Sequence, residues 1–295
     1  MRLLITGSEG QLGSELKRQL RAGGCVLGEL PRELAGAKSF CTQFDELDIC
    51  DEAAVDSYVR EMCPDVVLHC AAMTDVDGCE EDPAQAERVN GTAVRYIAQA
   101  CQGVGAKLVY VSTDYVFSGD KHSAYMTDDA CVPQTAYGRS KRSGEENALA
   151  YCSRTFIVRT AWLYGFHGKN FVKTILRKAA GSDLIRVVSD QYGNPTNVED
   201  LAYHMLLLAA TERYGIYHCT GGGVCNWYEF AREIVRLSGH GCRVEPCASA
   251  EYPQKAKRPA YSALDHSALE AAVGDKMRPW QEALRDHIDR LEEME

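Results

Sequence analysis

The sequence lacks any run of apolar residues long enough to cross a bilayer as a helix, which takes about 18 residues. Its first residues, MRLLITGSEGQLG, do not contain the long apolar core of a signal peptide. Basic residues are also scarce, since 32 Lys and Arg stand against 42 Asp and Glu, giving a formal net charge of −10. These shortages argue against a membrane or a nucleic acid as a partner and predict a cytoplasmic protein.

Patterns typical of disulfides and metal sites are missing too. The thirteen cysteines are an odd number, and no two are spaced as Cys-x-x-Cys. The eight histidines include no His-Glu-x-x-His pair, the spacing of many zinc enzymes. The acidic stretch DVDGCEED (75–82) lacks the sixth-position glycine of a calcium loop. The sequence therefore predicts reduced, largely structural thiols and no metal site.

What the sequence does contain is an alternation of short apolar runs with helical segments. The apolar runs are the expected strands, at 3–6, 25–30, 65–71, 107–112 and 155–160. Strands that are apolar throughout and alternate with helices predict a parallel sheet covered on both faces. This is a doubly wound, Rossmann-like α/β fold, in which ligands bind at the carboxyl ends of the strands.

The pattern becomes less regular after residue 160. We expect a dinucleotide-binding domain over residues 1–160, with residues 185–212 contributing to it. Residues 161–295 are expected to form a smaller C-terminal substrate lobe, interleaved with the sheet. No internal repeat or low-complexity linker separates the two parts.

A glycine-rich turn opens the first expected helix. The stretch TGSEGQLG places Gly7, Gly10 and Gly13 at intervals of three, directly after the first strand. Glycine permits a tight turn and lets backbone N–H groups approach a pyrophosphate, which then lies at the positive end of the helix. In this strand–turn–helix context the pattern predicts a dinucleotide site.

The choice between NADH and NADPH stays open at this point. Glu29 lies at the end of the second expected strand and Arg32 follows it. An acid there favours a free ribose and an arginine favours a 2′-phosphate, and the presence of both favours NADPH slightly. Asp48 either contacts the adenine or is a helix N-terminal acid beside Asp51. The full set expected at the coenzyme is Gly7, Gly10, Gln11, Leu12, Gly13, Arg32, Asp48, Ile49, Ala71, Ala72, Met73, Tyr137 and Lys141.

A second pattern, in AYGRSK (136–141), points to carbonyl reduction. Tyr137 and Lys141 are four residues apart and share one face of a helix. Thr113 ends the buried run LVYVST, at the edge of the sheet where a nicotinamide ring would lie. A phenol can give a proton to a carbonyl that accepts a hydride, a neighbouring ammonium can lower the pKa of that phenol, and a threonine can donate a hydrogen bond to the developing oxyanion.

Five stretches extend this pattern over residues 1–202. They are ITGSEGQLGSEL, CAAMTDVDGCEEDPAQAERVN, VSTDYVFSG with AYGRSK, VRTAWLYGFHGKNFV, and VVSDQYGNPTNVEDLA. In this order and spacing the chain resembles the dTDP-4-dehydrorhamnose reductases, a branch of the extended short-chain dehydrogenase/reductases. KRPAYSALD resembles a further motif of that family, with Tyr261 where asparagine is typical.

The resemblance implies roles for individual residues. It makes Thr113, Tyr137 and Lys141 catalytic, and it implies that the protein is a monomer or a homodimer. Residues implied at the nucleotide-sugar substrate are Thr113, Asp114, Trp162, Asn170, Gln191 and Pro195. Trp162 could instead be a core aromatic and Asn170 a helix cap. Some members pair through Mg²⁺ held by glutamates; Glu15 and Glu199 match two such positions without a clear third, so we expect no metal.

The implied function is reduction of the 4-keto group of dTDP-4-dehydro-L-rhamnose by NADPH, with NADH possible. Two alternatives stay open. The regulatory β-subunit of methionine adenosyltransferase shares these motifs and serves as a binding partner. Nucleotide-sugar epimerases and dehydratases use the same Tyr and Lys, but a dehydratase normally carries two acids after the strand-end threonine, whereas Asp114 is followed here by Tyr115.

Overall fold

The computed structural model describes residues 1–252, 254–274 and 276–292. At its centre is a six-stranded sheet in the order β12-β7-β6-β5-β1-β4, in which every neighbouring pair is parallel. Its strands are β1 (Arg2–Thr6), β4 (Lys38–Thr42), β5 (Val66–His69), β6 (Lys107–Thr113), β7 (Thr155–Thr160) and β12 (Gly215–His218). The predicted doubly wound α/β fold is confirmed.

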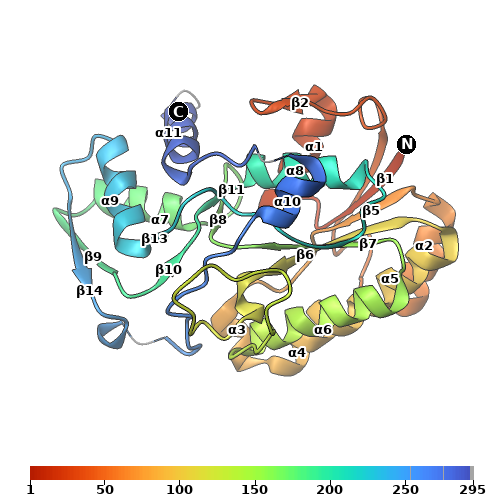
Figure 1. Ribbon diagram of the computed structural model, residues 1–295, viewed down its shortest axis with the longest axis horizontal. Coiled ribbons are helices and arrows are strands. Elements are labelled where there is room, and N and C mark those ends of the chain that lie inside the picture. Colours follow the sequence, from red (N-terminus) through yellow and green to blue (C-terminus); the bar gives the residue numbers. More distant parts are fainter. Residues whose placement is uncertain (253, 275, 293–295) are drawn as a thin grey trace.

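Helices cover both faces of this sheet (Figure 1). One face carries α1 (Gln11–Ala22), α8 (Val198–Ala209) and α10 (Ser267–Val273), and the other carries α2 (Glu52–Met62), α5 (Ala93–Val104) and α6 (Ala136–Tyr151). Strand β1 feeds both cores because successive side chains of a strand point to opposite faces. Leu3 and Ile5 pack under α1 and α8, and Leu4 packs on the other side.

Three short helical segments lead from β5 to α5: α3 (Val76–Glu81), α4 (Pro83–Glu87) and a π-helical turn (Arg88–Thr92). Two 3-10 turns lie elsewhere, one directly after β6 (Asp114–Val116) and one later in the chain (Ser249–Glu251). Pro83 opens α4, because a first-turn residue needs no N–H partner within the helix.

The prediction for the second strand of the sheet is wrong. Within the run 25–30, β2 (Gly24–Cys25) and β3 (Gly28–Glu29) form a small antiparallel hairpin of their own. The sheet neighbour of β1 is instead β4, an edge strand with a largely exposed start. Arg32 therefore lies before β4 begins, on the side of the sheet opposite the carboxyl ends, and it is solvent-exposed.

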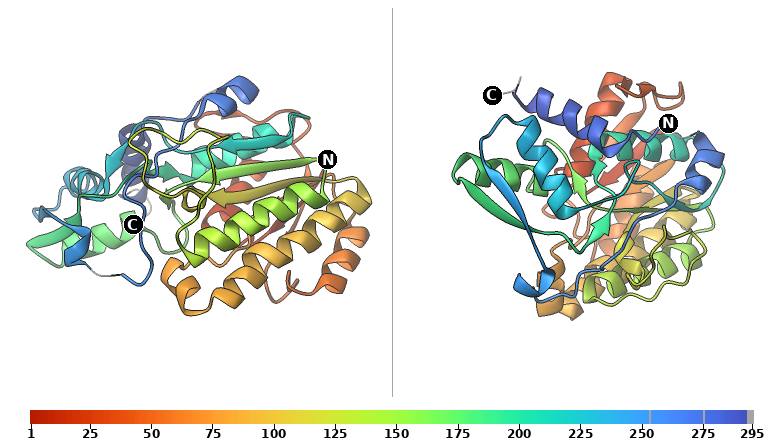
Figure 2. Two further views of the ribbon diagram at one scale, coloured as in Figure 1. Left: turned by 60° about the horizontal axis from the view of Figure 1, so that its bottom comes forward. Right: turned by 60° about the vertical axis from the view of Figure 1, so that its left-hand side comes forward.

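The remaining elements build the smaller lobe (Figure 2). They are β8 (Leu163–Tyr164), α7 (Phe171–Ala180), β9 (Leu184–Val188), β10 (Tyr192–Gly193), β11 (Thr196–Asn197), β13 (Cys225–Asn226), α9 (Trp227–Leu237), β14 (Arg243–Cys247) and α11 (Trp280–Glu292). A separate core around Phe230 and Ile234 holds α7, α9 and α11 together. Of the range 185–212, α8 packs on the sheet, whereas β9 pairs with β14 in the lobe.

Two further properties bear on the environment of the chain. No helix among the described residues has both the length and the apolar character needed to cross a membrane. All thirteen cysteines are free thiols. Burial raises the pKa of Cys25 to about 11 and that of Cys70 to about 12, so these thiols keep their protons at neutral pH.

Candidate active site

A cleft of about 510 Å³ opens where the central strands end at their carboxyl edge. Residues from β6 and β7 line it together with the turn after β1, the start of α1 and the first turns of α6. The predicted residues Gly7, Gly10, Gln11, Leu12, Gly13, Ala72, Thr113, Asp114, Tyr137, Lys141 and Trp162 all line this cleft. The structure thus brings together the glycine turn and the expected reducing centre.

The glycine turn is shaped for a close approach of backbone to ligand. Gly7 has φ +64°, and a side chain there would meet the backbone of Ala71 at 2.8 Å. A side chain at Gly13 would lie 2.6 Å from Cα of Ser8. Gly10 is the N-cap of α1 and supplies no side-chain cap, so the first N–H groups of the helix stay open to an anion.

A neighbouring cavity of about 310 Å³ lies beyond Gly7, between the ends of β4 and β5. Asp48, Ile49, Ala71, Ala72 and Met73, all predicted at the coenzyme, line it. Asp48 accepts a hydrogen bond from the N–H of Cys50 at 2.9 Å, and the N-cap of α2 is Asp51. Asp48 is therefore not the helix cap, and its carboxylate stands at the wall of this cavity.

The centre of the cleft joins β6 to α6. Thr135 caps α6 by accepting a hydrogen bond from Gly138 N at 3.0 Å, and this fixes the first turn, which carries Tyr137. A side chain at Gly138 would collide with the carbonyl of Tyr115, so glycine allows α6 to pack directly on the end of β6. Tyr137 and Lys141 then face Thr113 across the cleft.

Burial dominates the electrostatics of this pair. It lowers the pKa of Lys141 to about 7, against the opposing effect of the Glu145 carboxylate. It raises the pKa of Tyr137, although a hydrogen bond with Thr113 works in the other direction. Tyr137 therefore rests as the protonated phenol, the form that can donate. The Lys141 ammonium lies 4.2 Å from the ring centroid of Tyr110, which fixes its position over an aromatic face.

Behind Lys141 lies a fully buried ion pair. Arg159 donates two hydrogen bonds to Glu145, from Nε and Nη2, each 2.8 Å long. Glu145 also accepts a 2.6 Å hydrogen bond from Ser112 Oγ on β6. Because Glu145 lies one helical turn after Lys141, this pair anchors α6 to β6 and β7 beneath the expected catalytic residues.

A second pocket, of about 470 Å³, continues from the cleft into the lobe. It shares Tyr115 with the cleft and carries three basic side chains, Lys178, Arg186 and Arg258. Arg258 is held by Asp77 at 3.0 Å, while its Nη1 atom is buried without a hydrogen-bond partner among the described residues. Sequence reasoning missed these three cations and Trp227, because separate elements of the lobe bring them together with no common spacing.

The expected substrate residues occupy different environments. Trp162 lines the cleft, and its backbone has φ +49°. Its ring stacks on the ring of Trp227, with 3.5 Å between the ring centroids. Gln191 lines the second pocket. Asn170 caps α7 by accepting from Lys173 N, as its alternative interpretation predicted, and it donates to Gln11 Oε1. Pro195 lies among buried residues between β10 and β11, where its carbonyl faces Gly221.

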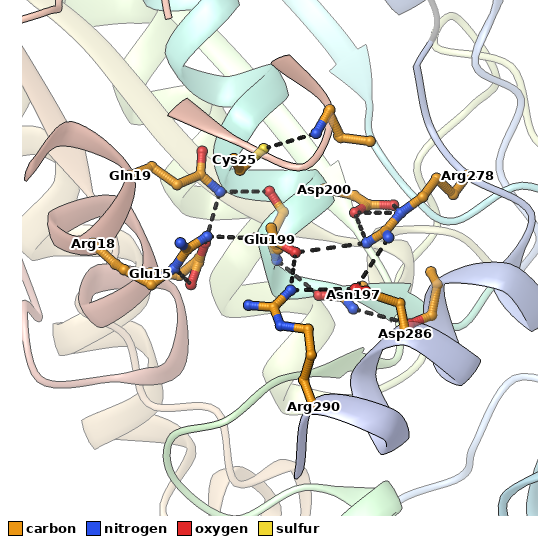
Figure 3. Close-up of polar contacts among 12 residues, drawn as sticks. Glu15, Arg18, Gln19, Cys25, Asn197, Glu199, Asp200, Arg278, Asp286 and Arg290 are labelled. Carbon is orange, nitrogen blue, oxygen red and sulfur yellow. Dashed lines mark hydrogen bonds and ion pairs between the residues drawn. The ribbon is translucent and has the colours of Figure 1, made fainter. Parts of the chain in front are cut away.

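Glu15 and Glu199 lie outside the cleft, in a network of ion pairs (Figure 3). Arg18 bonds to both carboxylates, and Arg290 bonds to Glu199 at 2.7 Å. Beside them Arg278 pairs with Asp200 at 2.6 Å. Within residues 1–252, 254–274 and 276–292, no group of three or more acidic, histidine or cysteine side chains is arranged to hold a metal ion. These carboxylates instead fasten α11 to α1 and α8.

A doubly wound sheet with a glycine turn after β1, and with a Tyr-x-x-x-Lys helix facing a strand-end threonine, defines the extended short-chain dehydrogenase/reductase class. Comparison with known proteins narrows the class. The chain belongs to the family described as RmlD substrate binding domain, which it matches over residues 1–293.

Three relatives show how close the similarity is. The chain is 43% identical to a dTDP-4-dehydrorhamnose reductase of Streptomyces griseus, over 98% of this chain and 94% of that protein. A crystal structure of a dTDP-4-dehydrorhamnose reductase from Clostridium acetobutylicum superposes with a TM-score of 0.93 at 41% identity, covering 99% and 100% of the two chains. One from Bacillus anthracis, in complex with NADP, gives 0.91 at 38% identity, covering 98% and 99%.

Proposed function

We propose that this protein reduces the 4-keto group of dTDP-4-dehydro-L-rhamnose with NADPH. The observation that carries the proposal is the position of Thr113, Tyr137 and Lys141 in the glycine-lined cleft, where Tyr137 packs against Tyr115, a residue that also lines the cation-lined pocket. A coenzyme in the cleft and a sugar nucleotide in the pocket would meet beside these residues. The relatives named above, similar over nearly the whole chain, support the same reaction.

The cleft fits a dinucleotide on its own geometry. The uncapped start of α1 offers N–H groups to a pyrophosphate, and the space that side chains at Gly7 and Gly13 would fill is taken by backbone. The cavity beside Asp48 and Ile49 adjoins the glycine turn and is largely apolar, so it suits an adenine. NADPH bound in this way supplies the hydride.

The protein's own residues then handle the carbonyl oxygen. Tyr137, held protonated by burial, donates its proton as negative charge develops on that oxygen. The Lys141 ammonium stabilises the phenolate that remains, which compensates for the burial that disfavours it. Thr113 donates a second hydrogen bond to the developing oxyanion. No metal is needed in this scheme.

The second pocket suits the nucleotide part of the substrate. A diphosphate carries negative charge that Lys178, Arg186 and Arg258 can balance. The stacked rings of Trp162 and Trp227 offer an apolar surface between this pocket and the cleft. We therefore place the sugar against Trp162 and Asp114, with the diphosphate farther into the lobe.

Another residue must bind the 2′-phosphate, because Arg32 lies near the amino end of β4 and the coenzyme cleft lies at the carboxyl ends of the strands. The glycine turn contacts the carboxyl end of β4 through a hydrogen bond of 3.2 Å from Ser8 N to the carbonyl of Thr42. Lys17 lies near the carboxyl end of β4. Burial raises the pKa of the Cys41 thiol in that strand, and the positive charge of Lys17 is close enough to work against this rise. Its ammonium pairs with Glu9 of the turn. We propose that Lys17 binds the 2′-phosphate of NADPH.

Replacing Lys17 with methionine should weaken NADPH binding about tenfold and leave NADH binding nearly unchanged, because a charge-assisted contact contributes roughly 1.5–3 kcal/mol and Lys17 is partly exposed. Glu9→Gln should strengthen NADPH binding, since it removes a negative charge beside the phosphate. Arg32→Met is the matched control and should affect neither coenzyme. Titration calorimetry with both coenzymes measures all three, and an equal loss of NADPH and NADH in Lys17→Met would contradict the assignment.

Gly10→Val should abolish coenzyme binding without unfolding the protein. A side chain at Gly10 meets only the carbonyl oxygen of Gly7, at 3.3 Å, and the residue has φ −68°, which valine tolerates. The new side chain would occupy the space of the pyrophosphate. Gly241→Ala, outside the cleft, leaves open space around the added methyl group at a residue without a positive φ, and it serves as the control. Retained NADPH affinity in Gly10→Val, measured by calorimetry, would argue against a pyrophosphate at this turn.

The reaction itself is tested with purified protein, dTDP-4-dehydro-L-rhamnose and NADPH. We expect the absorbance of the reduced nicotinamide to fall with the keto sugar present and to stay constant without it. Co-purification with methionine adenosyltransferase without turnover would favour the regulatory alternative. Turnover with no external coenzyme would favour an epimerase or dehydratase, which retains its NAD. A cytoplasmic location and a monomeric or homodimeric state stay predictions.

A further inference from the structure

The hydroxyl of Thr113 has more potential partners than it can serve. It already accepts a hydrogen bond from Tyr115 N, at 3.2 Å. Its single proton points to Oδ1 of Asp114, 3.0 Å away, and the oxygen of Tyr137 also lies within hydrogen-bonding reach. A substrate carbonyl in the cleft would be another acceptor. One proton cannot serve three acceptors, so something must decide where it goes.

Asp114 is the group placed to decide. It directly follows Thr113, is 2% exposed, and lines the same cleft. Its second oxygen, Oδ2, is buried and makes no hydrogen bond within the described part of the chain. The groups that face it are the hydroxyls of Thr113 and Ser262, the phenols of Tyr115 and Tyr137, and the backbone N–H groups of Asp114 and Tyr115, rather than cations. Arg258 contacts this cluster through its hydrogen bond with Tyr115.

The two protonation states of Asp114 set opposite directions for the Thr113 proton. An ionised Asp114 accepts it, and Thr113 then presents only lone pairs to the substrate. A protonated Asp114 donates to Thr113 instead. The two lone pairs of the hydroxyl then accept from Asp114 and from Tyr115 N, and its proton is free for the carbonyl oxygen. Only the second state leaves the Thr113 proton free for the substrate.

We propose that Asp114 is a positioning residue which, when protonated, turns the hydroxyl proton of Thr113 toward the substrate carbonyl. The proposal rests on the proposed reduction. Asp114 keeps its own proton throughout, and the proton that the product gains comes from Tyr137. Asp114 therefore acts by orienting an oxyanion donor and not as a second acid.

The pH dependence follows from the burial of Asp114, which raises its pKa to about 6. Because the protonated form is the active one, kcat/KM should fall as pH rises through this value. Lys141 must also be protonated, and its pKa of about 7 adds a second fall. Above both values the logarithm of kcat/KM should therefore decrease with a slope of about two per pH unit.

The test is the pH profile of Asp114→Asn. The amide donates to Thr113 at every pH, so the fall of kcat/KM near pH 6 should disappear. Above pH 7 the logarithm of kcat/KM should then decrease with a slope of about one per pH unit. At pH 8 the activity should exceed that of the parent by roughly tenfold or more, which is part of the contribution of an oxyanion donor. In a Thr113→Val background the same change should have no effect on the profile. Melting temperatures check that both variants are folded.

Three results overturn the proposal: an unchanged slope in Asp114→Asn, a uniform loss of activity at every pH, or the same effect of Asp114→Asn in the Thr113→Val background. Each requires that the parent protein turns over the keto sugar. A parent with no turnover at all would instead overturn the proposed function, so the two failures are distinguishable.

Discussion

Replacing Tyr137 with phenylalanine should lower kcat by about 10²–10⁴-fold, the usual contribution of a general acid. The substitution removes one oxygen from a half-buried ring that packs edge-on against Tyr115 at 5.5 Å, so the packing stays the same. Substrate and coenzyme affinities should change little, because the proton is needed mainly in the transition state. Steady-state kinetics on the keto sugar measure the effect.

The matched control is Tyr151→Phe, at the far end of the same helix, where the ring is 40% exposed and lies outside the cleft. Its kcat should equal that of the parent. Lys141→Met should also lower kcat, and it should remove the fall in activity near pH 7, since the group that loses its proton there is gone. Near-parental turnover by Tyr137→Phe would show that Tyr137 is not the proton donor.

Arg159→Met should destabilise the protein by about 3 kcal/mol, the lower end of the cost of breaking a buried ion pair, because Glu145 keeps its ion pair with Arg142 at 2.9 Å. The side chains of Arg159 and Glu145 are 1% and 0% exposed, so Glu145 cannot recover its lost hydrogen bonds from water. Arg159 also donates to the carbonyl of Thr127 at 3.2 Å and lies over the ring of Phe117. Denaturant unfolding monitored by circular dichroism measures the change.

Arg60→Met provides the comparison for this prediction. Arg60 makes an ion pair of similar length with Asp56, but its side chain is 60% exposed. We expect its loss to change stability by less than about 1 kcal/mol, because water screens and replaces an exposed pair. Equal free energies of unfolding for the two variants would mean that the Glu145–Arg159 pair does not anchor α6 to the sheet.

The parts of the fold that the sequence predicts well are those in which local pattern and burial agree. The runs at 65–71 and 107–112 contain central strands buried on both faces, so they are largely apolar and easily recognised. The edge strand β4, KSFCT, mixes polar and apolar residues because its start is exposed. The hairpin at 25–30 is more apolar and resembles a central strand, which is why the sequence pattern points to Arg32 for the coenzyme preference.

The candidate site divides in the same way. The glycine turn and the Tyr137–Lys141 pair are patterns within short stretches, and the strand order of the sheet brings them together. The cations of the second pocket come from α7, β9 and the segment before residue 260, so no local spacing reveals them. The competition for the Thr113 proton depends on the burial of Asp114 and on distances that only the three-dimensional structure provides.

The most direct test of the proposed reaction follows the hydride. NADPH deuterated at the transferable position of the nicotinamide is incubated with the purified protein and dTDP-4-dehydro-L-rhamnose, and the sugar product is analysed by NMR and mass spectrometry. The account predicts dTDP-L-rhamnose carrying one deuterium, bound to C4. A product without deuterium, or with deuterium at another carbon, would contradict it.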